Sequence, residues 1–256
     1  MVRATIASAH VGHCGLGSKP DLADPAVQRY PSEGALVAGM NWPVAALADR
    51  IGAAPSGPVY AYVLSSVSGS AAGFQQRGTA PNFQGGSITL CTCKHHMRSG
   101  RAAVDWPGCW VAGFTSVSVS AAHCHWLFYL MRVERAFESQ FDLWQALPRS
   151  SREAKAADRH PLGDLYRPLS DELAGGERFQ VARYQPPCPS HDHYQGWEDD
   201  VHYPGGRRPA LLVGAAEHSY VWSGPMVRAR PEWRLGRGHR RLSGPTELMD
   251  RLEGTT

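Results

Sequence analysis

The stretch "HWLFYLMRVERAF", residues 125–137, decides which fold class the sequence predicts. Its apolar run fits either a buried strand or a buried helix, because periodicity does not separate the two in a short apolar segment. Its aromatic content favours a strand, and with a strand here strands outnumber helices along the chain. We therefore predict an α+β fold in which short strands form a small β-barrel with flanking helices and long irregular loops.

Other segments share this strand signature of apolar, aromatic and β-branched residues. The predicted strands are residues 59–65, 87–93 and 108–119, followed by a tightly connected pair at 208–214 and 218–224. Residues 69–86, between the first two strands, are predicted to form a long loop, and loops of this length are often functional.

Three segments carry helix signals, and a polar segment separates the second from the third. The predicted helices are residues 43–51, residues 141–147 before Pro148, and a final helix that starts near Pro245 and ends before Gly254. Residues 149–208 are polar and rich in proline and histidine, so we expect them to be mostly irregular.

Composition places the chain among globular proteins and divides it into two parts. Of its 256 residues, 43% are apolar and 19% are charged. Residues 1–57 are rich in glycine, alanine and proline, and we expect a partly disordered N-terminal extension. Residues 58–256 are expected to form the barrel-like domain.

The N-terminal sequence and the cysteines indicate the compartment. The first residues contain only a short apolar patch, too short for a secretory signal, and no segment approaches the roughly 20 apolar residues of a membrane span. The six cysteines are therefore expected to be free thiols. We predict a cytoplasmic protein that does not interact with a membrane.

The stretch "GGSITLCTCKHHMRSGR", residues 85–101, allows a metal site, a reactive thiol or a basic turn. Zinc prefers thiolate and imidazole donors, but its paired cysteines are usually separated by two to four residues, and one residue separates Cys91 from Cys93. The residues considered as ligands are Cys91, Cys93, His95, His96, Cys109, His123, Cys124, His125, Cys188, His191 and His193. We predict no metal site and no cofactor, with a zinc-bearing interaction module as a weaker alternative.

The thiol alternative depends on Cys93 and its neighbours. If the predicted strand continues past residue 93, His95 shares the face of Cys93 and serves as its base, while Lys94 points to the other face. Buried free cysteines are more often inert packing residues.

The third alternative is a basic, aromatic-lined pocket. The net charge of +3 is small, so attraction for phosphate must come from local clusters. Lys94, Arg98 and Arg101 form one cluster, and "GRGHRR" at 236–241 forms another. Aromatic side chains in the predicted strands provide surfaces on which an extruded base stacks. Two such clusters beside a barrel favour a nucleotide or nucleic acid as partner.

Seven segments carry a resemblance to a known family. They are "VYAYVL" (59–64), "APNFQGGSITLCTCKHHMR" (80–98), "GCWVAGFTS" (108–116), "LFYLMRVERAF" (127–137), "LGDLY" (162–166), "HSYVWSG" (218–224) and "GRGHR" (236–240). In this order they resemble the nucleotide modification associated domain 2 family, over roughly residues 58–253. The layout is also similar, more faintly, to PUA-like barrels such as EVE and ASCH domains.

The resemblance implies a protein, in phage or bacterial systems, that binds or processes a modified nucleobase in DNA or another nucleic acid. The matching positions include Asn82, Thr89, Cys93, Lys94, Arg98, Trp110, Asp164, Gly238 and His239. The chain departs from the family pattern at His95, where a proline is usual, and at Cys109, where an aspartate is usual. The lost carboxylate puts acid–base chemistry at position 109 in doubt.

Two functions follow as hypotheses. In a binding protein, Tyr62, Trp110 or Trp222 stacks on the base, Asn82 bonds its edge, and Lys94, Arg98, Arg237 and His239 hold phosphate with the Gly238 backbone. In an enzyme, Lys94 or Cys93 acts as nucleophile and Asp164 or His239 carries the proton.

Overall fold

The computed structural model describes residues 28–29, 39–54, 56–70, 73–117, 123–236 and 238–254. Its strands are β1 Gln28–Arg29, β2 Val59–Leu64, β3 Val67–Ser70, β4 Gly73–Gln76, β5 Thr89–Leu90, β6 Trp110–Thr115, β7 Leu127–Phe137, β8 Leu211–Val221, β9 Val227–Ala229, β10 His239–Leu242 and β11 Leu252–Gly254. Its α-helices are α1 Val44–Gly52, α2 His95–Ser99, α3 Gln140–Ala146, α4 Arg149–Lys155, α5 Glu198–His202 and α6 Pro245–Asp250.

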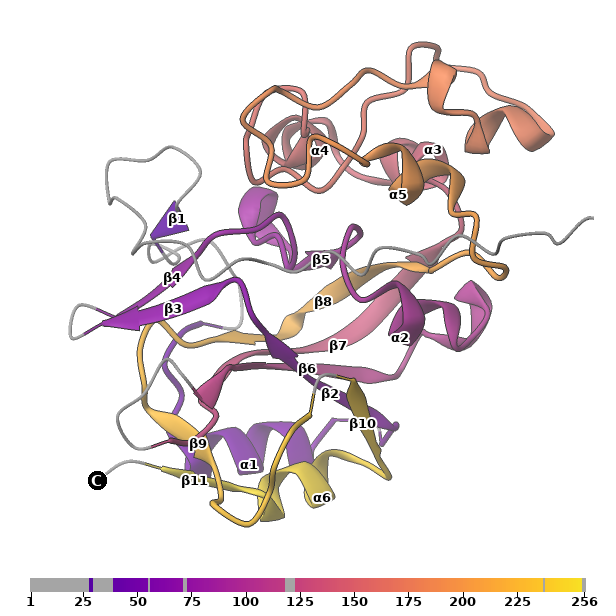
Figure 1. Ribbon diagram of the computed structural model, residues 1–256. Coiled ribbons are helices and arrows are strands. Elements are labelled where there is room, and N and C mark those ends of the chain that lie inside the picture. Colours follow the sequence, from indigo (N-terminus) through magenta and orange to yellow (C-terminus); the bar gives the residue numbers. More distant parts are fainter. Residues whose placement is uncertain are drawn as a thin grey trace, which may run out of the picture.

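A curled six-stranded sheet forms the centre of the molecule (Figure 1). Its strand order is β10-β2-β6-β7-β8-β5, with β2 and β6 parallel and the other neighbours antiparallel. The register shifts along β6–β7 and β7–β8, and such irregularities increase the twist and bend of a sheet. The fold is therefore α+β, with a half-barrel sheet and short helices.

The strand predicted at residues 125–137 is confirmed as β7, which lies inside the sheet between β6 and β8. Residues 127–131 are completely buried. Because both faces of this strand are covered, its sequence is a continuous apolar run rather than an alternating one. The strand predicted at 59–65 is present as β2, and the strand predicted at 108–119 is present as the shorter β6; residues 118 and 119 lie outside the described residues.

The predicted loop 69–86 and the predicted strand 87–93 are wrong in part. At the start of the predicted loop, β3 (Val67–Ser70) and β4 (Gly73–Gln76) pair as antiparallel strands. The strand that follows contains only Thr89 and Leu90; the chain then bends, takes a left-handed backbone conformation at Lys94 and enters α2. Cys93 and His95 consequently do not share a strand face.

The predicted pair of strands at 208–214 and 218–224 is a single strand, β8. Two nearby positions of β7, Met131 and Val133, pair with Ser219 and Gly214 of β8. The residues between Gly214 and Ser219 bulge out of the ladder without ending the strand, and the Ser219 hydroxyl donates to the Ala215 carbonyl at 2.6 Å. A polar interruption that resembles a turn in sequence is thus a bulge.

The helices predicted at 43–51 and 141–147 are confirmed as α1 and α3. The final helix is shorter than predicted: α6 ends at Asp250, and Leu252–Gly254 forms β11 beside β9. Helices α1 and α6 pack side by side below the sheet, and α3, α4 and α5 lie at its other end (Figure 1).

Part of the predicted N-terminal extension packs into the main core. Leu47 and Ile51 of α1 lie one helical turn apart and belong to the same buried cluster as the central strands. Residues 1–27, 30–38 and 55 lie outside the described residues. In the described part of the chain, no helix combines the length and the apolar character that crossing a membrane requires. The cytoplasmic location stays a prediction.

Candidate functional site

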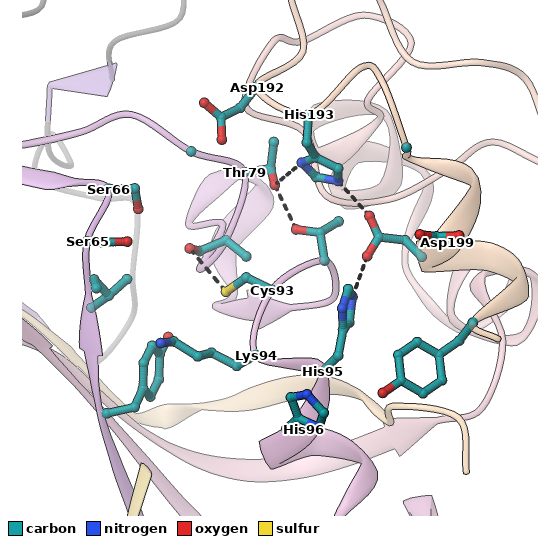
Figure 2. A pocket seen from close by; sticks show the side chains of 18 of the residues that line it. Ser65, Ser66, Thr79, Cys93, Lys94, His95, His96, Asp192, His193 and Asp199 are labelled. Atoms are coloured by element: carbon teal, nitrogen blue, oxygen red, sulfur yellow. Dashed lines mark hydrogen bonds and ion pairs between the residues drawn. The ribbon is translucent and has the colours of Figure 1, made fainter. Parts of the chain in front are cut away.

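A cavity of about 680 Å³ lies in front of α2. Its walls come from four segments that are distant in sequence: the end of β2, residues 78–80, residues 92–96 and residues 192–205. Cavities of this size hold small ligands such as nucleotides. Figure 2 shows Lys94, Ser65 and Ser66 on one side of the cavity and His193 and Asp199 on the other.

The turn that carries Lys94 is held from beneath by Arg98. Lys94 has φ 59° and ψ 41°, a left-handed conformation that is uncommon for residues other than glycine and asparagine. The Arg98 Nε donates to the Cys93 carbonyl at 2.7 Å, and its Nη1 donates to the Ala210 carbonyl at 2.8 Å. The buried guanidinium thereby fixes the turn against the chain that leads into β8.

Lys94 packs over an aromatic ring of the sheet. Its Nζ lies 4.9 Å from the ring centre of Tyr62, whose hydroxyl is 2.7 Å from that of Tyr129. Burial lowers the pKa of the Lys94 ammonium, and the neighbouring Cys93 opposes this effect. His239 lies opposite Tyr62 on β10, and its pKa is lowered by burial and by the charge of Lys94. The Lys94 turn and the β10 segment therefore meet at Tyr62.

The opposite wall is organised around the carboxylate of Asp200, which is only 2% exposed. Its Oδ1 accepts from His95 Nε2 at 2.6 Å, and its Oδ2 accepts from His193 Nε2 at 2.5 Å and from the Tyr166 hydroxyl at 2.9 Å. Two imidazoles from different segments are thus oriented by one acid, α2 supplying the first and residues 191–193 the second.

The same contacts set the charge of this wall. Burial alone would raise the pKa of Asp200, but the hydrogen bonds from His193 and His95 outweigh it and hold that pKa below its usual value. Burial alone would lower the pKa of His193, but Asp200 outweighs it and raises that pKa. The pair favours a carboxylate beside an imidazolium.

A hydroxyl continues this chain of contacts. Thr79 Oγ1 lies 3.5 Å from His193 Nδ1 and 2.7 Å from Thr92 Oγ1. Carboxylate, imidazole and hydroxyl therefore follow one another along the cavity wall, in the order that proton transfer in acid–base catalysis uses.

Of the four residues predicted to be catalytic, Cys93 and Lys94 line the cavity. Burial raises the pKa of Cys93 to about 11, so its thiol is protonated at neutral pH. His239 lies beside Lys94 but is not part of the lining. Asp164 is buried away from the cavity, where its Oδ1 accepts from the Thr89 hydroxyl at 3.0 Å.

The residues predicted to bind nucleotide are distributed more widely, and Tyr62 is the one that lines the cavity. Asn82 Oδ1 accepts from the buried Lys155 ammonium at 3.0 Å, away from the cavity. Trp110 and Trp222 are completely buried in the core. The exposed Gly238 precedes β10, and Arg237 lies outside the described residues.

Arg98 does not lie where the sequence analysis places it. It was grouped with Lys94 and Arg101 as a phosphate-binding cation, but it is fully buried and donates to backbone carbonyls. It supports the Lys94 turn and does not line the cavity.

Sequence reasoning did not assign Asp200, His193, Thr79 or Tyr166 to a joint site. The sequence pattern indicates His191 and His193 only as metal ligands, and Asp200 follows a glutamate and another aspartate in a polar segment. The dense run of histidines and acids from 191 to 200 was the available signal.

No group of three or more cysteine, histidine or acidic side chains in the described ranges is arranged to hold a metal ion. Comparison of the chain with protein-family models, curated proteins and solved structures finds no match. The resemblance to the nucleotide modification associated domain 2 family stays a prediction.

Proposed function

We propose that this chain binds a nucleobase or nucleotide, modified bases included, in the cavity in front of α2. The supporting observation is the unequal distribution of charge around the cavity. Lys94 lies on one side with His239 just beyond it, whereas Asp199 lies on the other side, where Asp200 bonds to His95 and His193. A nucleotide has a matching polarity, because it carries anionic phosphate at one end and hydrogen-bonding base edges at the other.

Planar side chains on the acidic side of the cavity suit a base. The rings of His95 and half-buried Tyr203 lie 5.3 Å apart, and both residues line the cavity. Rings of this kind stack on bases taken out of a helix. The curled sheet and the sequence resemblance support the finer proposal of a PUA-like barrel from a nucleotide modification system.

Replacing Lys94 by asparagine tests the binding function. The variant removes the cation but keeps a residue that tolerates the left-handed backbone. We expect affinity for nucleoside monophosphates to fall about 30-fold, the effect of losing one charge-assisted hydrogen bond. Calorimetric titration with dCMP, 5-methyl-dCMP, 5-hydroxymethyl-dCMP and the other standard monophosphates measures it.

Arg149→Gln is the matched control, because Arg149 is an exposed cation on α4 that does not line the cavity. It is expected to bind like the unmodified chain. If the unmodified chain binds none of the nucleotides, or if Lys94→Asn binds them as tightly as the unmodified chain does, the proposed site is refuted.

A second candidate function, acid–base processing of the bound base, is favoured by the contacts from Asp200 through His193 to Thr79. In this function His193 transfers the proton and Asp200 fixes its orientation. The half-buried thiol of Cys93 is less suited, because its pKa of about 11 leaves little thiolate at neutral pH.

His193→Gln separates processing from binding. We expect the conversion rate of bound nucleotide to fall about 100-fold, the lower range of general acid–base catalysis. Affinity for the unreacted nucleotide changes little, because Lys94 is intact. Mass spectrometry of the nucleotide panel after incubation measures conversion. If the unmodified chain binds a nucleotide but leaves its mass unchanged, the processing function is excluded and the binding function stands.

A further inference from the structure

We propose that the nucleotide reaches the cavity as part of a single-stranded nucleic acid, whose phosphates follow a strip of basic side chains along the β10 edge of the sheet. This inference rests on the proposed function of the cavity. The strip, called here the β10 strip, consists of the cations Lys94, Arg101 and Arg241 and the imidazole of His239, which donates a hydrogen bond as a neutral ring.

The β10 strip lies on the same face of the sheet as the cavity. β10 is the edge strand, and His239 and Arg241 lie opposite Tyr62 and Tyr60 of β2. Paired residues of antiparallel strands project to the same face, and Tyr62 lines the cavity. Arg240 lies opposite Ala61 and projects to the other face.

Contacts around Tyr60 hold the strip together. Arg101 Nη1 donates to the Tyr60 hydroxyl at 3.1 Å, and the His239 ring lies 5.8 Å from the Tyr60 ring. Arg241 lies opposite the same Tyr60 in the β10–β2 ladder.

The charges of the strip remain available to a ligand. None of its members forms an ion pair with a carboxylate in the described part of the chain, although Asp105 lies near Arg101. His239 and Arg241 are exposed on the edge strand. Unpaired cations on an open surface are the usual contacts of nucleic-acid phosphates.

The strip continues directly from the cavity. Lys94 lies over Tyr62 at the cavity wall, His239 lies opposite the same tyrosine, and Arg241 follows about 7 Å further along β10. A base held in the cavity would leave its own phosphate at Lys94 and the neighbouring phosphates at His239 and Arg241. A free mononucleotide contacts Lys94 but does not reach Arg241.

Charges on an edge strand also serve another purpose, because they prevent sheets from pairing edge to edge. That role does not distinguish Arg240 from Arg241, since both lie on the same exposed strand. Phosphate binding does distinguish them, because the two side chains project to opposite faces of the sheet.

The test compares Arg241→Gln with Arg240→Gln, which remove the same charge from adjacent positions. The probes are fluorescein-labelled short single strands of DNA and of RNA, each with a central 5-methylcytosine or cytosine, and the corresponding free monophosphates. We expect Arg241→Gln to weaken the binding of single-stranded oligonucleotides about 5-fold near 0.1 M salt. The slope of log affinity against log salt concentration is expected to decrease in magnitude by about 0.7. Arg240→Gln and all monophosphate affinities are expected to change less than twofold.

Each outcome decides one proposal. The proposal for the β10 strip is overturned if the oligonucleotide binds no more tightly than its monophosphate, or if the two variants lose the same oligonucleotide affinity. Either result leaves the cavity proposal intact. Tighter binding of duplex than of single strands also overturns the proposal for the strip. Failure of both strands and monophosphates to bind the unmodified chain overturns the proposed function itself. Comparison of the DNA and RNA arms identifies the source of the strand.

Discussion

Arg98→Met is expected to lower the free energy of unfolding by about 3 kcal/mol. Arg98 is 0% exposed, so the substitution leaves the cavity lining and the molecular surface unchanged. It removes the donors to the Cys93 and Ala210 carbonyls, which remain buried between α2 and β8. Each unsatisfied carbonyl costs about 1–3 kcal/mol. The substitution also removes the cost of burying the guanidinium charge, which offsets part of this loss of stability.

Thermal unfolding measures this loss, and a decrease of about 10 °C in the melting temperature is expected for a chain of this size. Arg98→Lys is the informative companion, because an ammonium keeps the charge but does not reproduce the planar fork that reaches both carbonyls. It is expected to recover less than half of the loss. A melting temperature for Arg98→Met within 2 °C of the unmodified chain would show that Arg98 does not hold the turn.

Asp200→Asn is expected to abolish the ordered pair of imidazoles and to lower the free energy of unfolding by about 2 kcal/mol near pH 5. This loss of stability is smaller than for a fully buried ion pair. The side chains of His95 and His193 are 30% and 31% exposed, so water replaces part of the hydrogen bonding that Asp200 provides. The asparagine keeps the shape of the side chain but accepts at one oxygen only.

The pH dependence of this loss follows from two opposite shifts. The pKa of His193 is raised above 6.5, so its contribution is complete below pH 6.5 and is lost as the pH rises through the raised value. The pKa of Asp200 is lowered below 3.8, so its contribution is complete above pH 3.8 and is lost as the pH falls through the lowered value. The difference in stability between the two proteins is therefore largest between these limits.

Denaturant unfolding across this pH range measures the difference. The burial of His191 lowers its pKa to about 4 and gives an opposite slope, but both proteins contain it and the comparison largely removes it. Asp199→Asn is the control, since Asp199 is the exposed neighbour of Asp200. A stability difference that stays constant from pH 3 to pH 8 would contradict the assigned charges of the pair.

Local sequence signals predicted the elements that depend on local chemistry. The strand at 127–137 and the helix at 44–52 follow from apolar runs and spacing that their own residues display. The β8 strand was divided in two because a bulge and a turn have similar polar sequences. A bulge differs from a turn in how it pairs with the neighbouring strand, and that strand is distant in the sequence.

The candidate site was harder to predict, because its chemistry is assembled across the chain. His95 and Asp200 are separated by 105 positions, yet their atoms lie 2.6 Å apart. Arg98 was misassigned for the related reason that a basic cluster in sequence does not reveal which of its members points inward. Lys94, which follows the predicted strand 87–93, and Tyr62, an aromatic residue within the predicted strand 59–65, both line the cavity.

The parallel pairing of β2 with β6 has a consequence for how the cavity arises. Parallel neighbours require a long connection, and here the chain between Leu64 and Trp110 travels to the far edge of the sheet, where β5 pairs with β8, before it returns. That excursion carries the Lys94 turn over the sheet. The same connection therefore completes the edge of the central sheet and supplies one wall of the cavity, so a ligand that contacts Lys94 also stabilises the β5–β8 edge.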